Sequence, residues 1–267
     1  MIAGTESRVT RAFAQARDET RSVLIGYLPA GYPTVSKSIE LVLTMIDHGV
    51  DLIEVGLPYS DPLMDGPVIQ EAVSAALLEG ATTDSVLEVV GAITDHGGSS
   101  VVMSYWNPIE RYGVTRFAEN LVQRGGSGLI TPDLTIEEAV PWITAAAESS
   151  LDPIFLVAPS STDSRISAIA QQTRGFIYAA STMGVTGARD QVSSMAPQLV
   201  QRVRQLTTLP VAVGLGVSTG AQAAAISEYA DGVIVGSAFV RAAQTGGIAA
   251  VGELAAELAQ GVRASLP

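Results

Sequence analysis

Two carboxylates lie close together in a segment that could perform proton chemistry. Glu54 falls near the end of an apolar run, DLIEV, and Asp65 follows in a proline-containing segment, LPYSDPLMDGP. Successive side chains of a strand point to opposite faces, so Glu54 would share a face with Leu52 and not with Ile53. If that face lines a ligand cavity, desolvation would raise the pKa of Glu54 toward the range of an acid-base catalyst. A strand-edge glutamate in water is the alternative, and this segment alone leaves both interpretations open.

The composition bounds the kind of protein that carries these acids. The chain has 267 residues, of which 47% are hydrophobic, and a net charge of -12. This length is common for one α/β barrel, so we expect a single domain over residues 1–267. The negative charge argues against nonspecific binding to nucleic acid or to anionic membranes. No apolar run approaches the roughly 20 residues that cross a bilayer and no signal segment is evident, which predicts a cytoplasmic protein.

The chain has few of the residue types that metal sites and thiol chemistry require. The chain has no cysteine, and its two histidines, His48 and His96, are far apart. Disulfides, thiolate nucleophiles and metal clusters of cysteine or histidine are therefore not expected.

Strand and helix patterns alternate along the chain. Short β-rich runs occur at residues 23–27, 52–55, 101–104, 128–131, 154–157, 176–180, 211–213 and 232–235. Helical periodicity occurs between them, at residues 35–48, 84–95, 115–125, 136–149, 164–173, 191–205 and 220–229. An amphipathic helix over residues 9–17, with Ser7 as its N-cap, precedes the first strand. This order predicts an α/β fold, a (β/α)8 TIM barrel with an extra N-terminal helix, while a doubly wound open sheet is the alternative.

Glycine-rich turns follow the last three predicted strands. Their sequences are STMGVTG at residues 181–187, GLGVS at 214–218 and GSA at 236–238. Glycine lets backbone N–H groups approach an anion, and a helix beginning at Gly236 and Ser237 would add its positive dipole end. Each turn alone could merely close a loop, but the three together predict a phosphate site without lysine.

These motifs, taken in order, resemble the tryptophan synthase alpha chain family over nearly the whole chain. The resemblance is carried by EVGLPYSDPLMDGP at residues 54–67, GYLPAGYP at 26–33, YWNP at 105–108 and GVTG at 184–187. The run AASTMGVTGARD is similar to the actinobacterial form of the family. The resemblance implies a lyase of tryptophan biosynthesis, which cleaves indole-3-glycerol phosphate by a retro-aldol reaction into indole and glyceraldehyde 3-phosphate.

A retro-aldol cleavage needs an electron sink, and the residues restrict where it can be. Lys37 is the only lysine and lies in a predicted helix, which argues against a Schiff base. The scarcity of ligands argues against a metal enolate. The remaining sink is the indole of the substrate, once it is protonated at C3. The resemblance implies that Glu54 is the catalytic acid and base and that Asp65 stabilises positive charge on the indole nitrogen.

The resemblance also implies a set of substrate-binding residues. They are Tyr27, Tyr178, Thr186, Gly187, Gly216, Gly236 and Ser237. Thr186 would bond Asp65 when mobile loops after the second and sixth strands close, although a helix-cap role is the alternative. Tyr178 could instead be a core aromatic residue whose hydroxyl bonds the backbone.

A partner follows from the resemblance as well. The family implies a pyridoxal-phosphate-dependent beta chain, in an αββα heterotetramer, that converts the indole to L-tryptophan, with no cofactor in this chain. Residues 58–62 and the pair Asn107-Pro108 would belong to the docking surface. Three other functions stay open: a freestanding indole-3-glycerol-phosphate lyase, a phosphate-binding barrel isomerase of a phosphoribosylated aromatic compound, and a noncatalytic regulatory barrel subunit.

Overall fold

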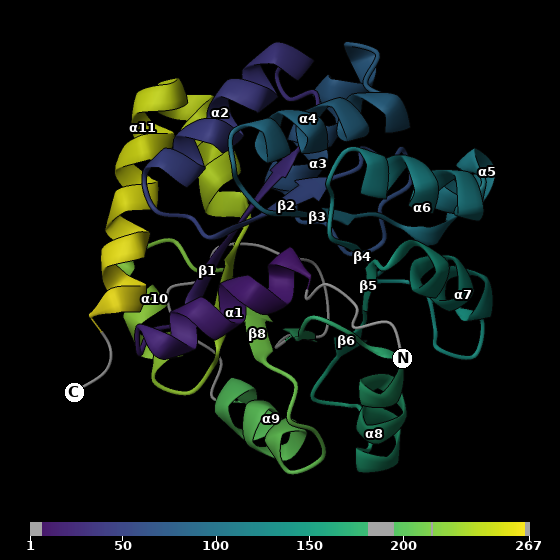
Figure 1. Cartoon of the computed structure of the whole chain (residues 1–267). Coiled ribbons are helices and arrows are strands. Elements are labelled where there is room, and N and C mark those ends of the chain that lie inside the picture. Colours follow the sequence, from purple (N-terminus) through teal and green to yellow (C-terminus); the bar gives the residue numbers. More distant parts are fainter. Residues whose placement is uncertain (1–6, 181–194, 215, 265–267) are drawn as a thin grey trace.

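The chain folds around a parallel sheet that closes into a barrel (Figure 1). The computed structural model describes residues 7–180, 195–214 and 216–264. The strands are β1 Val23–Pro29, β2 Leu52–Gly56, β3 Ser100–Met103, β4 Gly128–Ile130, β5 Asp152–Ile154, β6 Leu156–Val157, β7 Ile177–Ala180, β8 Val211–Gly214 and β9 Gly232–Val235. Their hydrogen-bonded order is β5-β4-β3-β2-β1-β9-β8-β7-β6.

The two ends of this order meet in sequence. Only Phe155 separates β5 from β6, and the backbone N–H of Tyr178 on β7 donates to the carbonyl of Phe155 at 3.2 Å. β5 and β6 are therefore two halves of one barrel strand, interrupted where the predicted strand at residues 154–157 was continuous. The ring of parallel strands confirms the predicted barrel and excludes the open sheet.

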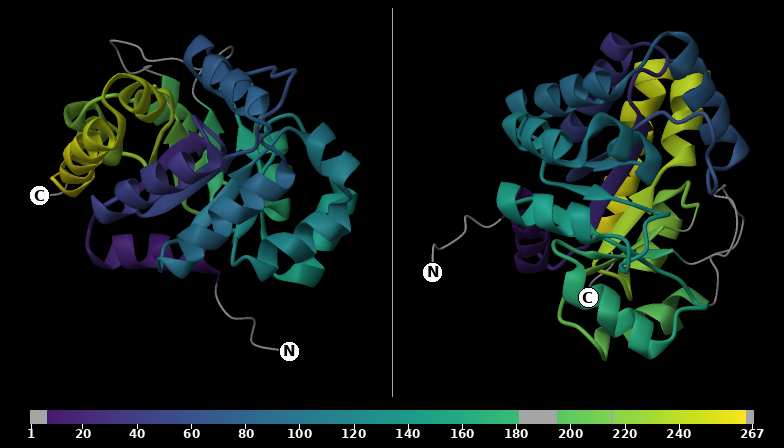
Figure 2. Two further views of the ribbon diagram at one scale, coloured as in Figure 1. Left: turned by 90° about the horizontal axis from the view of Figure 1, so that it is seen from above. Right: turned by 90° about the vertical axis from the view of Figure 1, so that its right-hand side faces the viewer.

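Helices surround the strands in all views (Figure 2). They are α1 Arg8–Asp18, α2 Val35–Asp47, α3 Pro67–Leu78, α4 Thr83–Asp95, α5 Trp106–Tyr112, α6 Val114–Gln123, α7 Val140–Ser149, α8 Asp163–Gln172, α9 Met195–Arg204, α10 Gly220–Ser227 and α11 Ser237–Arg263. None of the helices in the described part of the chain is long and apolar enough to cross a membrane.

Three helices differ from the sequence-based expectation. α3 and α5 had not been predicted, and α7 begins at Val140 where a start at residue 136 was expected. Pro141 accounts for the late start, because proline fits only the first turn of a helix and stands there in α7.

The barrel has an inner and an outer core. Inward side chains such as Ile25, Leu52 and Ile234 form one buried cluster with Phe13 of α1, whereas Ile53 and Val55 belong to the layer between strands and helices. The rings of Phe13 and Phe176 lie 5.4 Å apart. The predicted N-terminal helix thus closes one end of the barrel, and the carboxyl ends of the strands are left for a site at the other end.

Candidate active site

Glu54 lies on β2 and faces the inside of the barrel. Its neighbour two residues back, Leu52, belongs to the inner cluster, while Ile53 and Val55 belong to the outer one. Only 1% of the Glu54 surface is exposed. Among the described residues no group donates a hydrogen bond to Oε2 of this carboxyl. The structure therefore places the first carboxylate in a nearly dry interior, which removes the alternative of a solvated strand-edge residue.

Burial dominates the electrostatics of Glu54. Desolvation, followed by the negative charge of Asp65, raises the pKa of Glu54 to about 8. A carboxyl with such a pKa carries its proton at neutral pH and can both donate and accept it. The carboxyl oxygen that has no partner among the described residues is available to bond a substrate atom.

Asp65 approaches the same interior from a loop. Residues 57–66 connect β2 to α3, and Gly66 and Pro67 begin that helix with the proline at its first position. Burial raises the pKa of Asp65, and a hydrogen bond with the Tyr105 hydroxyl opposes this rise. The same hydroxyl accepts a bond from the backbone N–H of Met64 at 2.9 Å. The Tyr105 hydroxyl therefore bonds both the loop backbone, at Met64, and the carboxylate of Asp65, and so fixes their relative position.

Tyr105 is the residue of this cluster that the sequence-based prediction missed. It had been quoted only within the YWNP motif that carries the family resemblance, although it lies two residues after β3, at the end of the barrel where the strands' carboxyl termini meet. A hydroxyl-bearing side chain at a strand end was the signal that could have identified it. Its ring packs 5.5 Å from that of Tyr59.

Tyr27, buried on β1, and Tyr178, half-buried on β7, complete the group. Burial raises the pKa of both hydroxyls well above the ordinary value, and the charges of Glu54 and Asp65 add to the rise. Both tyrosines therefore stay neutral and can donate hydrogen bonds. The structure brings these two rings and the two carboxyls together at one end of the barrel.

Glycines at the ends of β2 and β8 make room for these rings. A Cβ atom on Gly56 would lie 2.5 Å from the Tyr27 hydroxyl, and one on Gly214 would lie 2.8 Å from the Tyr178 hydroxyl. No ordinary side chain fits at either distance. Gly214 had been predicted as part of a phosphate-binding turn, and Gly56 had no predicted role; in the structure both glycines accommodate a tyrosine.

The amino terminus of α11 offers an anion cradle beside Tyr27. Gly236 caps the helix without a side-chain hydrogen bond, and Ser237 follows as a buried residue. A Cβ atom on Gly236 would lie 3.6 Å from the Tyr27 ring. Gly216, after β8, has a φ of +67°, a conformation that favours glycine. Uncapped N–H groups and the helix dipole suit a phosphate group here.

Two predicted residues cannot be placed. Thr186 and Gly187 belong to the glycine-rich turn after β7 and lie outside the described residues.

Metal ligands and a lysine nucleophile were the two other kinds of catalytic group to look for in the described residues. Over residues 7–180, 195–214 and 216–264, no three histidines and acids cluster as a metal site would require. Lys37 lies on α2 and pairs with Glu40 on the surface at 2.6 Å, away from the barrel interior.

A (β/α)8 barrel with a buried, proton-carrying glutamate and a second carboxylate on a loop is typical of an acid-base enzyme, and the uncapped start of α11 would suit an anionic substrate. Comparison with known proteins narrows the class. The sequence pattern of the Tryptophan synthase alpha chain family matches residues 13–263, and the chain belongs to this family.

Individual relatives agree with this assignment. The tryptophan synthase alpha chain of Nocardia farcinica is 57% identical over 260 residues, which are 97% of each chain. That of Mycobacteroides abscessus is 58% identical over 256 residues, which are 96% of this chain and 97% of the relative. Among solved structures, Mycobacterium tuberculosis tryptophan synthase has a TM-score of 0.93 and 54% identity, over 97% of this chain and 99% of the other. The resemblance noted in the sequence, to the actinobacterial form, is confirmed.

Proposed function

We propose that this chain cleaves indole-3-glycerol phosphate to indole and glyceraldehyde 3-phosphate, as the alpha subunit of tryptophan synthase. The observation that carries the proposal is the buried Glu54, whose pKa is raised to about 8 and which faces Asp65 across the carboxyl end of the barrel. Membership of the family supports the same reaction. Neither a regulatory subunit nor an isomerase is favoured by the site.

The proposed reaction starts with a proton from Glu54. Transfer to C3 of the indole ring gives an indolenine, whose C=N bond accepts the electrons of the breaking C–C bond. Glu54, now ionised, removes the proton of the glycerol hydroxyl next to that bond, and indole and the aldehyde result. A pKa near neutrality suits a group that donates and then accepts.

Asp65 stabilises the intermediate of this reaction. Protonation at C3 places positive charge on the indole nitrogen, and a carboxylate that accepts the N–H bond lowers the energy of that charge. Tyr105 donates a hydrogen bond to Asp65, which lowers the pKa of this carboxyl and favours its ionised form. Tyr27 and Tyr178, as neutral donors in the same interior, contact the glycerol and indole parts of the substrate.

The phosphate group binds at the cradle of Gly216, Gly236 and Ser237. Backbone N–H groups and the dipole of α11 supply the attraction that a chain of net charge -12 lacks overall. By resemblance, Gly187 belongs to the same cradle and Thr186 binds Asp65 when the loops close.

A beta chain is the expected partner of the complex. The M. tuberculosis structures related to this chain are of tryptophan synthase, and one is described as its aminoacrylate-bound form. We place an αββα heterotetramer in the cytoplasm, with pyridoxal phosphate in the beta chain and none in this one. The docking surface includes Asn107, which is exposed, and the loop of residues 58–62, of which Pro58 is buried and Asp61 exposed.

Release of indole from indole-3-glycerol phosphate tests the function. The wild-type chain should release indole, and faster with a beta chain present, whereas Glu54→Gln should lose about 10²-fold or more in kcat because the proton donor is gone. Glu110→Gln, on the surface of α5, is the matched control and should keep wild-type turnover. Unchanged turnover in Glu54→Gln would refute the assignment, and high activity without any response to the beta chain would indicate a freestanding lyase.

A further inference from the structure

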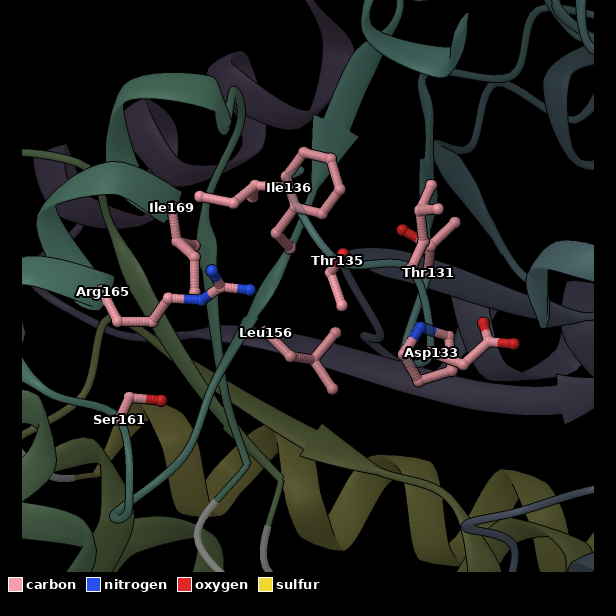
Figure 3. A pocket seen from close by; sticks show the side chains of 11 residues that line it. Thr131, Asp133, Thr135, Ile136, Leu156, Ser161, Arg165 and Ile169 are labelled. Atoms are coloured by element: carbon pink, nitrogen blue, oxygen red, sulfur yellow. The ribbon is translucent and has the colours of Figure 1, made fainter. Parts of the chain in front are cut away.

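A cleft lies beside the ends of β4 and β6, and neither Glu54 nor Asp65 is among the residues that line it (Figure 3). It is lined by the segment after β4, by Phe155 and Leu156 of the divided strand, and by Ser161 and α8. Its volume is about 180 Å³. Glu54, Asp65, Tyr27, Tyr105 and Tyr178 are not among its walls, but its wall residue Leu156 pairs with Tyr178 across β6 and β7, so the cleft adjoins the proposed catalytic centre.

Hydrogen-bond donors gather at this cleft. Figure 3 shows the Arg165 guanidinium reaching from α8 into the space between Ile136 and Leu156. One of its nitrogens, Nη1, contacts Glu137, and a guanidinium has five N–H donors in all. The Ser161 hydroxyl accepts a bond from the N–H of Ala158 at 3.0 Å, and a hydroxyl can donate as well as accept.

Thr131 supplies the second, independent observation. Its side chain lines the cleft and is 98% buried, with 2% of its surface exposed, and its hydroxyl has no partner among the described residues. A buried hydroxyl without a hydrogen bond is destabilising, and valine would have the same shape without that cost. A ligand that forms a hydrogen bond with the Thr131 hydroxyl would remove this cost.

The acids nearby do not block an anion. The Asp133 carboxylate accepts the backbone N–H of Trp106 at 2.9 Å, and in Figure 3 it points away from Arg165. Glu137 is 61% exposed in its side chain, so it can leave Arg165 for solvent when another anion enters. The rest of the wall is apolar, formed by Ile136, Phe155 and Ile169.

We propose that this cleft binds a small carboxylate with an apolar body. The carboxylate lies on Arg165 and Ser161 in place of Glu137, the apolar part packs on Ile136 and Ile169, and the Thr131 hydroxyl bonds the ligand from within. Charge-assisted hydrogen bonds to a guanidinium give affinity, and the apolar wall limits the size.

Benzoate is a suitable probe, with benzamide as the uncharged compound of the same shape. In the full-length chain labelled at isoleucine methyl groups, benzoate should produce saturable shifts at Ile136 and Ile169. The affinity for benzamide should be at least about tenfold lower than that for benzoate, because benzamide lacks the charge that Arg165 recognises. No saturable shift at these methyls, or equal affinity for the two compounds, would overturn the proposal.

Variants separate binding from folding. Arg165→Gln should weaken benzoate about tenfold or more, while Glu137→Gln should tighten it, because the competing anion is gone. Thr131→Val should weaken binding without loss of stability in urea unfolding. Arg11→Gln, an exposed arginine on α1 at the other end of the barrel, is the matched control and should bind as the wild type does. Arg165→Gln with wild-type affinity, or Glu137→Gln with reduced affinity, would contradict the site.

Discussion

At the scale of residues, the site depends on a conflict between burial and charge. Glu54 and Asp65 are close enough for the ionised form of one to disfavour ionisation of the other, and both are desolvated. Among the described residues, a hydrogen bond from Tyr105 lowers the pKa of Asp65 and no such bond lowers that of Glu54, which favours the ionised form of Asp65 over that of Glu54. This difference supports the proposed roles, in which Glu54 transfers protons and Asp65 stabilises charge.

The raised pKa of Glu54 predicts a stability that depends on pH. Between the unfolded value of 4.5 and about 8, the folded chain holds a proton that the unfolded chain releases. The contribution of this proton to the unfolding free energy should therefore be complete below pH 4.5. Above that pH, the unfolding free energy should fall by about 1.4 kcal/mol per pH unit until about pH 8. Urea unfolding of Glu54→Gln should lack this fall and exceed the wild type at pH 8 by up to several kcal/mol. Parallel pH curves for the two proteins would contradict the prediction.

Tyr105 should act as a positioning residue. Tyr105→Phe removes the bonds to Asp65 and to the N–H of Met64, so the pKa of Asp65 should rise and its loop should loosen. We expect kcat to fall about tenfold, a loss of about 1.4 kcal/mol, and the acidic limb of the pH–rate profile to move upward. Tyr112→Phe is the control, because the Tyr112 hydroxyl bonds Asp84 at 2.7 Å and not Asp65. If the acidic limb of the pH–rate profile did not move, Tyr105 would contribute packing only and would not position Asp65.

At the scale of elements, strand ends determine which side chains meet. β2 and β8 both end in a glycine over which a tyrosine from a neighbouring strand lies. β1 pairs with β2 and β7 with β8, so each tyrosine covers the last residue of the adjacent strand. Glycine is thus required by a contact between strands and not by a turn.

Gly214→Ala tests this contact. The new Cβ would lie 2.8 Å from the Tyr178 hydroxyl and 3.3 Å from its ring, so we expect a loss of about 1–3 kcal/mol in unfolding free energy. The double variant Gly214→Ala with Tyr178→Phe should recover part of it, because the closest atom is gone. Gly91→Ala on α4 is the control, since its Cβ has 3.4 Å to the nearest atom and should not destabilise the helix. Strict additivity of the double variant would disprove the clash.

At the scale of the molecule, barrel closure and its floor hold the site. The ring closes at Phe155, between β5 and β6, and α1 fills the end opposite the carboxyls. The Ser7 hydroxyl, which caps α1, also donates to Asp152 of β5 at 2.5 Å. The N-terminal helix is therefore part of the barrel core.

Truncation of the floor should destabilise the whole chain. Phe13 is 3% exposed and packs on Phe176, so Phe13→Ala should cost about 3–5 kcal/mol of unfolding free energy. The exposed neighbour Arg11→Ala should change it by less than about 0.5 kcal/mol. Denaturant unfolding measures both, and a cost for Phe13→Ala as small as that of the control would show that α1 is dispensable.

Sequence periodicity was enough for the elements whose signal is local. Alternating apolar runs predicted the strands, and Ser7 was identified as the cap of α1. α3 escaped because its apolar residues surround much of the helix, and α5 because it is a short helix of seven residues. The start of α7 was misplaced because the constraint at Pro141 outweighs the apolar pattern before it.

The sequence by itself determined the barrel and the strand face of Glu54, since these follow from side-chain period. Residue types also showed that the chain has no cysteine and that its lysine, Lys37, does not stand at a strand end. The tertiary structure decided how acidic the carboxyls are and which partners they have. A pKa depends on burial and on charges that arrive from other strands, so the protonated state of Glu54, the bond from Tyr105 to Asp65 and the fit of tyrosines over glycines could be known only after the barrel had closed.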